Sequence, residues 1–116
     1  MFKENGYKTA IVGKWQLNGL QIDKVDRQIA KDNERPYKFG FDEYSLWQLT
    51  KLRSEGERFA NPLIEQNGTV LKRDINAYGP DVVSDYAVNF ISENKDRPFF
   101  IYYPCLLYTS DAADDL

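Results

Sequence analysis

Gly6-Tyr7-Lys8-Thr9-Ala10-Ile11-Val12-Gly13-Lys14-Trp15-Gln16-Leu17 is the stretch of this chain that decides the fold. Its middle is an unbroken run of small and β-branched residues between two glycines. Such a run is typical of a strand that is covered on both faces. We therefore predict a strand over Tyr7–Val12, followed by a loop over Gly13–Gly19. In an open sheet covered by helices, the carboxyl ends of the strands face the ligand crevice, so we expect Lys14 at a binding site.

Three later segments also carry clear patterns. Asn67-Gly68 lies between two short strand-like runs, and this dipeptide tolerates the positive φ angles of a two-residue hairpin turn. Helical periodicity after Pro80, which suits a first helical position, predicts an amphipathic helix over Pro80–Asn94. An aromatic run predicts a central strand over Phe99–Tyr103. The predicted apolar face of the helix consists of Val82, Val83, Tyr86, Ala87, Phe90 and Ile91.

The segments between these elements have weaker patterns. Apolar residues spaced among many charges predict a helix over Leu20–Glu34 that ends before Pro36. Aromatic and apolar residues predict a strand over Glu43–Thr50, and Lys51–Arg58 is a charged segment that we assign to a loop. Together these elements predict a mixed α/β fold. The first and the last of the predicted strands should be neighbours or near neighbours in one sheet.

Composition excludes several classes of protein. The 116 residues are 42% hydrophobic and 15% aromatic, which suffices for the core of one small domain. The net charge of −3 comes from three aspartates in the last six residues, so nothing indicates a nucleic-acid partner. No apolar run approaches the ~20 residues that a membrane span needs, and residues 1–6 do not resemble a signal peptide. Histidine is absent, so no imidazole of this chain can transfer protons near neutral pH.

The opening stretch resembles the second signature of the sulfatases, whose usual form is Gly-Tyr-x-Thr-x-x-x-Gly-Lys-Trp-His-Leu-Gly. It departs from that form at Gln16, where the family has His, and at Asn18, which precedes Gly19. The resemblance covers residues 1–104 and implies a partial alkaline-phosphatase-like sandwich, an incomplete mixed sheet flanked by helices. Further landmarks follow in the family's order at Phe39–Tyr44, Tyr78–Asp81 and Pro98–Pro104.

The resemblance stops at Cys105. Residues Cys105–Leu116 differ from the preceding chain in charge and residue usage, and they resemble a translated sequencing-library adaptor. An ordinary acidic C-terminal linker is the alternative. We therefore predict two parts: a partial sulfatase catalytic domain over 1–104 and a non-native tail over 105–116.

The resemblance also implies a chemistry. Sulfatases cleave sulfate esters, aryl or carbohydrate, with a formylglycine made from the Cys or Ser of a Cys/Ser-x-Pro-x-Arg motif and with a metal that is usually calcium. This chain contains no such motif, and its single cysteine, Cys105, lacks the required proline and arginine. The family's Asp-Asp and Asp-Asn metal clusters also lie outside it. We expect calcium and formylglycine in the parent protein, neither held by residues of this chain, and we expect the chain alone to be inactive.

Two residues of this chain are candidates for the site. Lys14 matches the family's motif lysine, which implies a catalytic and substrate-binding contact with the sulfate, and a compact ammonium suits that role. The alternative is a surface lysine in a loop. Gln16 stands at the histidine position, which implies substrate binding, but an amide cannot titrate.

Other conspicuous residues have both a functional and a structural interpretation. Trp15 and Trp47 could line a sugar-binding surface, although aromatic residues beside strands more often belong to the core. Asp42-Glu43 could serve acid–base catalysis, but adjacent strand residues point to opposite faces, which favours a turn or cap. Asn67-Gly68-Thr69 is formally a glycosylation sequon, and a bare hairpin turn is the favoured interpretation.

Two alternatives to a sulfatase fragment stay open from the sequence. One is a phosphodiesterase or phosphonate hydrolase of the same superfamily, which shares the sheet and the metal scheme. The other is a small non-catalytic binding domain. Sulfatases of this kind are often periplasmic or secreted, and the sequence leaves the localisation open.

Overall fold

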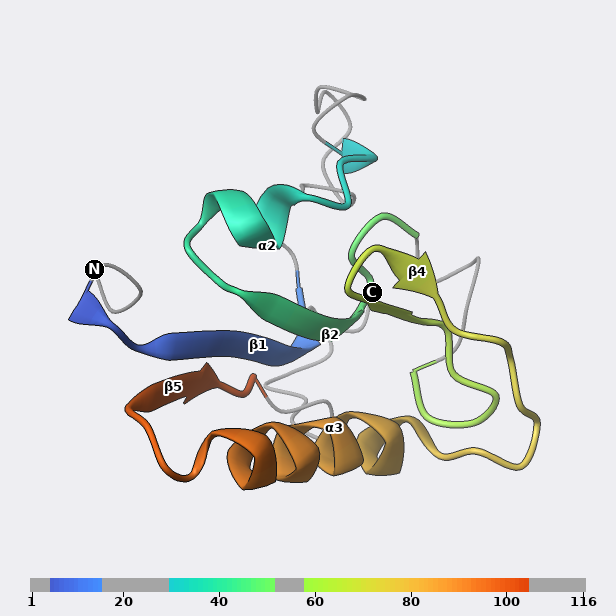
Figure 1. Cartoon of the computed structure of the whole chain (residues 1–116). Coiled ribbons are helices and arrows are strands. Elements are labelled where there is room, and N and C mark those ends of the chain that lie inside the picture. Colours follow the sequence, from blue (N-terminus) through green and yellow to red (C-terminus); the bar gives the residue numbers. More distant parts are fainter. Residues whose placement is uncertain (1–4, 16–29, 52–57, 105–116) are drawn as a thin grey trace.

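The computed structural model describes residues 5–15, 30–51 and 58–104, and these residues form one five-stranded sheet (Figure 1). The strand order is β4-β3-β2-β1-β5. Strand β1 runs parallel to both of its neighbours, whereas β2 and β3, and β3 and β4, pair antiparallel. The predicted mixed α/β fold is therefore confirmed. The elements are β1 (Lys8–Lys14), α2 (Arg35–Lys38), β2 (Glu43–Trp47), β3 (Ile64–Gln66), β4 (Thr69–Val70), α3 (Gly79–Asn94) and β5 (Phe99–Tyr102).

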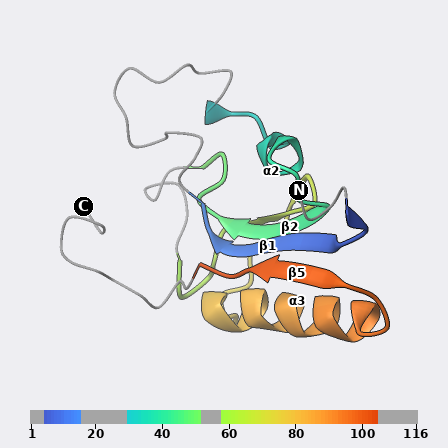
Figure 2. The same ribbon diagram turned by 90° about the vertical axis from the view of Figure 1, so that its left-hand side faces the viewer.

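Strand β1 is the centre of the described structure. Its five inner residues, 9–13, are buried, which agrees with the small and β-branched composition of this run. Helix α3 lies along one face of the sheet and α2 lies on the other (Figure 2). The strand extends two residues beyond the predicted Tyr7–Val12, so Lys14 is its last residue rather than part of a loop.

Two apolar clusters hold the layers together. The first packs the sheet against α3, and the second fills the opposite face, where Phe41 covers it. Because alternate strand residues point to opposite faces, Val12 belongs to the first cluster and Ile11 to the second. The buried members of the first are Val12, Trp47, Ile64, Val83 and Ala87; those of the second are Ile11, Trp15, Tyr44, Leu46 and Leu49.

Helix α3 confirms the predicted helix, with one correction to its apolar face. Val83, Ala87 and Phe90 are buried against the sheet, and the Phe90 ring meets Phe99 of β5 edge-on at 5.8 Å. Ile91 is 41% exposed, so the prediction that placed it on the buried face is wrong. The face that touches the described sheet is narrower than the apolar stripe of the sequence.

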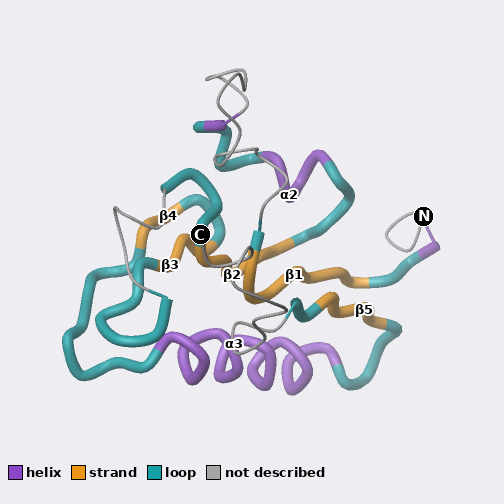
Figure 3. Tube along the Cα trace, turned by 180° about the vertical axis from the view of Figure 1, so that it is seen from behind, coloured by secondary structure: helices purple, strands orange, loops and turns teal. Residues whose placement is uncertain are grey.

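The turn between β3 and β4 is the predicted hairpin (Figure 3). Asn67 and Gly68 have φ angles of 49° and 89°, the two positive values that a type I′ turn requires. The Asn67 side chain is tied at both ends: Oδ1 accepts the Tyr44 N–H at 2.7 Å and Nδ2 donates to the Tyr86 hydroxyl at 3.0 Å. These bonds agree with the turn interpretation of the sequon.

Other predictions need correction or lie outside the described residues. Strand β5 pairs with β1, as predicted, but it is an edge strand of the described sheet and not a central one. The predicted strand over Glu43–Thr50 ends at Trp47, because Gln48 has a φ of 65° and leaves the extended conformation. Most of the predicted helix over 20–34, most of the loops over 13–19 and 51–58, and the tail over 105–116 lie outside the described ranges.

Candidate functional site

The carboxyl ends of the three parallel strands meet at one edge of the sheet. Lys14, the last residue of β1, pairs with Trp47, the last residue of β2. On the other side, the Lys14 N–H donates to the carbonyl oxygen of Pro104, which follows β5, at 3.3 Å. In open α/β sheets, ligands bind at this edge. The sequence-based placement of Lys14 beside a binding crevice therefore agrees with the strand directions.

Gly13 explains how β1 reaches this edge. Its φ of 121° is one that residues with a side chain rarely adopt, and a Cβ built on it would lie 2.0 Å from the Pro104 carbonyl oxygen. Only a glycine allows the two backbones to approach so closely. Gly13 thus permits the close approach to Pro104, and Lys14, the next residue, supplies the cation at this edge.

The Lys14 side chain is half-buried. Within 5–15, 30–51 and 58–104, none of the hydrogen bonds or ion pairs involves its ammonium group. By contrast Lys8, at the other end of the same strand, lies 3.8 Å from a Glu43 carboxylate oxygen. Lys14 therefore brings a cation to the carboxyl edge, and no described acidic group forms an ion pair with it. Gln16, the second sequence-based candidate, lies outside the described residues.

Buried polar side chains follow β2 at the same edge. Gln48 and Thr50 are each 7% exposed, and Glu65 of β3 is 4% exposed. The Glu65 carboxylate accepts the Thr50 N–H at 3.1 Å and the Thr50 hydroxyl at 2.5 Å, and Lys31 Nζ donates to the Thr50 carbonyl oxygen at 3.3 Å. This bonding fixes the chain just after β2. Sequence reasoning missed it, although a glutamate directly after Leu63-Ile64 in a short strand-like run was an available signal.

Arg58 is a second group that the sequence did not predict. It belongs to a charged segment assigned to a loop, yet it is only 6% exposed. Its guanidinium carbon lies 4.4 Å from the ring centroid of Phe59 and 5.5 Å from that of Trp47. Aromatic faces attract cations at such distances. The backbone of Arg58 also packs on α3, where a Cβ at Gly79 would come within 1.8 Å of the Arg58 carbonyl oxygen.

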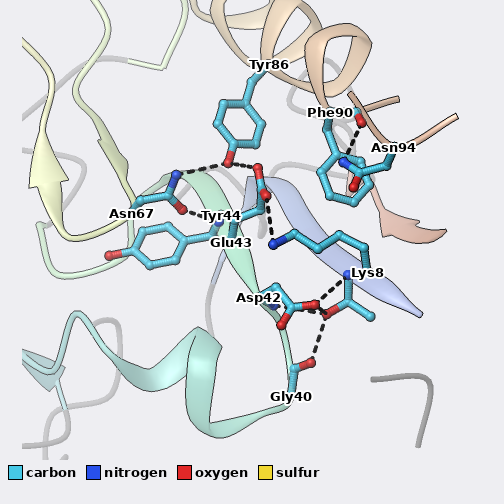
Figure 4. Close-up of polar contacts among 10 residues, drawn as sticks. Lys8, Gly40, Asp42, Glu43, Tyr44, Asn67, Tyr86, Phe90 and Asn94 are labelled. Atoms are coloured by element: carbon cyan, nitrogen blue, oxygen red, sulfur yellow. Dashed lines mark hydrogen bonds and ion pairs between the residues drawn. The ribbon is translucent and has the colours of Figure 1, made fainter. Parts of the chain in front are cut away.

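The acidic pair Asp42-Glu43 lies at the opposite end of the strands (Figure 4). Asp42 Oδ2 accepts the Thr9 N–H at 2.8 Å, and Thr9 Oγ1 accepts the Asp42 N–H at 3.0 Å. Glu43 accepts a hydrogen bond from the Tyr86 hydroxyl and forms the ion pair with Lys8. Both carboxylates thus join β1, β2 and α3 to one another, which agrees with the structural interpretation rather than with acid–base catalysis.

Two tyrosines of this network are held as neutral donors. Burial raises the pKa of Tyr44 to about 12. Burial, and secondly the hydrogen bond to Glu43, raise the pKa of Tyr86. Tyr44 donates to the Asn33 carbonyl at 2.8 Å, and its oxygen accepts the Gly68 N–H at 2.7 Å. These bonds attach the hairpin to the sheet, and the raised pKa values keep both phenols protonated near neutral pH.

The remaining sequence-based alternatives can now be placed. Trp15 and Trp47 are 1% and 3% exposed, so both belong to the core, and the sugar-surface alternative is not supported for them. The described ranges hold no group of three His, Cys, Asp or Glu side chains that could ligate a metal, so they do not fit the expected calcium ion. Across these ranges, no helix is long and apolar enough to cross a membrane.

The described chain is thus an α/β structure in which the Lys14 ammonium lies at the carboxyl edge of the parallel strands. The chain belongs to the sulfatase family, because the family's model matches residues 1–106. This match confirms the resemblance seen in the sequence. The matched range includes Gly13 and Lys14 at the end of β1.

Individual relatives agree with this assignment. The chain is similar to an N-acetylglucosamine-6-O-sulfatase of Bacteroides thetaiotaomicron, with 25% identity over 104 residues, 89% of this chain and 15% of the relative. A protein solved in complex with its substrate, D-glucosamine-2-N,6-O-disulfate, is 25% identical with a TM-score of 0.53, over 87% of this chain and 16% of that one. The fold also matches Ps i-CgsB, with a TM-score of 0.57 and 24% identity, over 97% of this chain and 27% of that one. The chain thus spans about a sixth to a quarter of the length of these proteins.

Proposed function

We propose that this chain is a segment of a sulfatase that hydrolyses sulfate esters, and that Lys14 binds the sulfate group. The observation that carries the proposal is the position of Lys14: it ends the central parallel strand at the edge where open α/β sheets bind ligands, and no described acidic group forms an ion pair with it. Its place in the Gly-Lys-Trp signature supports the same role.

The physical role of Lys14 follows from the charge of the substrate. A sulfate ester carries negative charge on its non-bridging oxygens, and this charge is redistributed as the ester bond breaks. A fixed ammonium group at hydrogen-bond distance stabilises that charge without taking part in bond formation. Gln16 is proposed to donate or accept a hydrogen bond to the same substrate. An amide cannot transfer a proton, so proton transfer is assigned to groups outside this chain.

The proposal treats the chain as incomplete for catalysis. The family's formylglycine would supply the nucleophile and calcium would supply charge neutralisation, and the described residues hold neither. We propose that both belong to other parts of the parent protein and that this chain alone is inactive. Residues 1–104 would then be a part of the parent protein's catalytic domain, and residues 105–116 would be a non-native tail.

A sulfated amino sugar is the substrate class that we favour. Two comparisons support it: the curated match is an N-acetylglucosamine-6-O-sulfatase, and a matching structure was solved with D-glucosamine-2-N,6-O-disulfate as its substrate. They cover 89% and 87% of this chain. We therefore propose a carbohydrate sulfate ester rather than an aryl sulfate.

The proposal is tested on the full-length gene product. The reading frame upstream should encode Cys/Ser-x-Pro-x-Arg, and the purified protein should release sulfate from N-acetylglucosamine-6-sulfate. Aryl sulfate and an aryl phosphodiester are the comparison substrates. Preferential cleavage of the phosphodiester, or an upstream frame without the motif, would reject the sulfatase assignment in favour of another hydrolase of the superfamily.

A further inference from the structure

Gln48 is the buried polar residue nearest in the chain to the end of β2. It follows Trp47, which is the register partner of Lys14, and the Trp47 carbonyl accepts the Trp15 N–H at 3.2 Å. Adjacent strands of a sheet lie roughly 4.8 Å apart. Gln48 and Lys14 therefore belong to the same part of the carboxyl edge.

The Gln48 side chain is largely buried and has no hydrogen-bond partner among the described residues. The residue is 7% exposed. Within the described structure, its amide makes none of the side-chain hydrogen bonds, whereas the amide of Gln66 accepts one from Ser45 Oγ at 2.9 Å. The atoms of the Gln48 amide are not among the described side-chain atoms that are fully enclosed without a hydrogen bond, so this amide keeps a small opening. An amide that has an opening and no described protein partner is available to bond a ligand that reaches it.

The backbone adds a second, independent observation. Gln48 has a φ of 65°, a left-handed conformation that costs a non-glycine residue roughly 1–2 kcal/mol. The other described non-glycine residues with positive φ are two asparagines, the type that tolerates this region best. A glycine would serve the turn at lower cost. The glutamine side chain is therefore unnecessary for the turn itself.

We propose that Gln48 binds a hydroxyl group on the alcohol portion of the sulfate ester, beside the sulfate held by Lys14. The inference rests on the proposed function and extends it to substrate recognition. A primary amide offers both a donor and an acceptor, which matches a hydroxyl group. Sulfate oxygens only accept, so they match the Lys14 ammonium better. Lys14 would thus bind the sulfate group and Gln48 the alcohol portion of the ester. Gln48 would favour sugars over alcohol portions that carry no further hydroxyl group.

The test compares two ligands on the full-length protein: inorganic sulfate and N-acetylglucosamine, each titrated by NMR. Gln48→Gly retains the positive φ without strain and removes the amide. We expect its affinity for N-acetylglucosamine to fall about five- to tenfold, the value of one neutral hydrogen bond, with a melting temperature at least equal to that of the wild type. Gln48→Ala should show the same loss of sugar affinity at lower stability.

Gln66→Ala is the matched control, because it removes an amide that is already bonded within the sheet. It should lower stability and leave sugar affinity unchanged. Unchanged sugar affinity in Gln48→Gly, or no sugar binding by the wild type, overturns the inference. Failure of the proposed function looks different: inorganic sulfate would then bind equally to wild type and Lys14→Ala.

Discussion

Replacing Gly13 by alanine should separate β1 from the chain that follows β5. The added Cβ would lie 2.0 Å from the carbonyl oxygen and 3.1 Å from the carbonyl carbon of Pro104. Neither atom belongs to a flexible side chain, so the two backbones must move apart. That movement should lengthen the hydrogen bond from the Lys14 N–H to the Pro104 carbonyl oxygen and weaken the pairing of β1 with β5.

The magnitude follows from a comparison with Gly68. Gly68 also has a positive φ, 89°, but no atom lies within 4 Å of its built Cβ. Gly68→Ala should therefore cost only the conformational penalty, roughly 1–2 kcal/mol. Gly13→Ala adds overpacking, typically ~1–3 kcal/mol. We expect a total of about 2–5 kcal/mol, larger than that of Gly68→Ala by at least ~1 kcal/mol.

Hydrogen exchange of the full-length protein, read by mass spectrometry, measures this difference locally. Peptides that cover β1 and β5 should exchange at least about five times faster in Gly13→Ala than in Gly68→Ala, since a tenfold change corresponds to ~1.4 kcal/mol. Urea denaturation gives the global counterpart. Equal exchange in β1 for the two variants would show that the close approach at Pro104 does not constrain the strand.

Two further predictions concern buried polar groups. The pKa of Tyr44 is raised from 10.0 to about 12, so the protonated phenol stabilises the fold below pH 10 and this contribution is lost as the pH rises through 12. The loss in the free energy of unfolding should approach ~2–3 kcal/mol. In urea titrations, Tyr44→Phe should abolish that part of the pH dependence. Glu65→Ala leaves the Thr50 N–H and hydroxyl without their acceptor, and should cost about 2–4 kcal/mol by urea denaturation. Glu65→Gln, which keeps an acceptor oxygen, should cost less than half of that, and equal costs would contradict the role of this oxygen.

Local chemistry explains the features that the sequence predicted well. A continuous apolar run between glycines was enough to predict the strand around Ile11. The tolerance of Asn67-Gly68 for positive φ angles was enough to predict the hairpin turn. Helix α3 followed from its periodicity and from Pro80 in its first turn. In each case one short segment carries the whole physical reason, so no knowledge of the rest of the fold was required.

The features that the sequence did not predict depend on tertiary contacts. Arg58 looked like part of a charged loop, but its guanidinium lies against the rings of Phe59 and Trp47, which the sequence does not show to be close. Gln48 ends β2 through a left-handed conformation that glutamine does not signal. Ile91 fits the helical period but is 41% exposed, because periodicity alone does not give the width of the face that the sheet covers. The candidate site was therefore predictable at Lys14 and not at its buried polar neighbours.

The measurement that tests the central claim most directly compares two lysines of one strand. Lys14 lies at the carboxyl edge of β1, while Lys8 lies at the other end in an ion pair with Glu43. In the full-length protein, Lys14→Ala should lower kcat/KM for N-acetylglucosamine-6-sulfate about 10²–10³-fold, as expected for loss of one transition-state donor, and Lys8→Ala should lower it less than about threefold. Equal effects of the two substitutions, or a Lys14→Ala variant as active as the wild type, would contradict the assignment of Lys14 to the sulfate site.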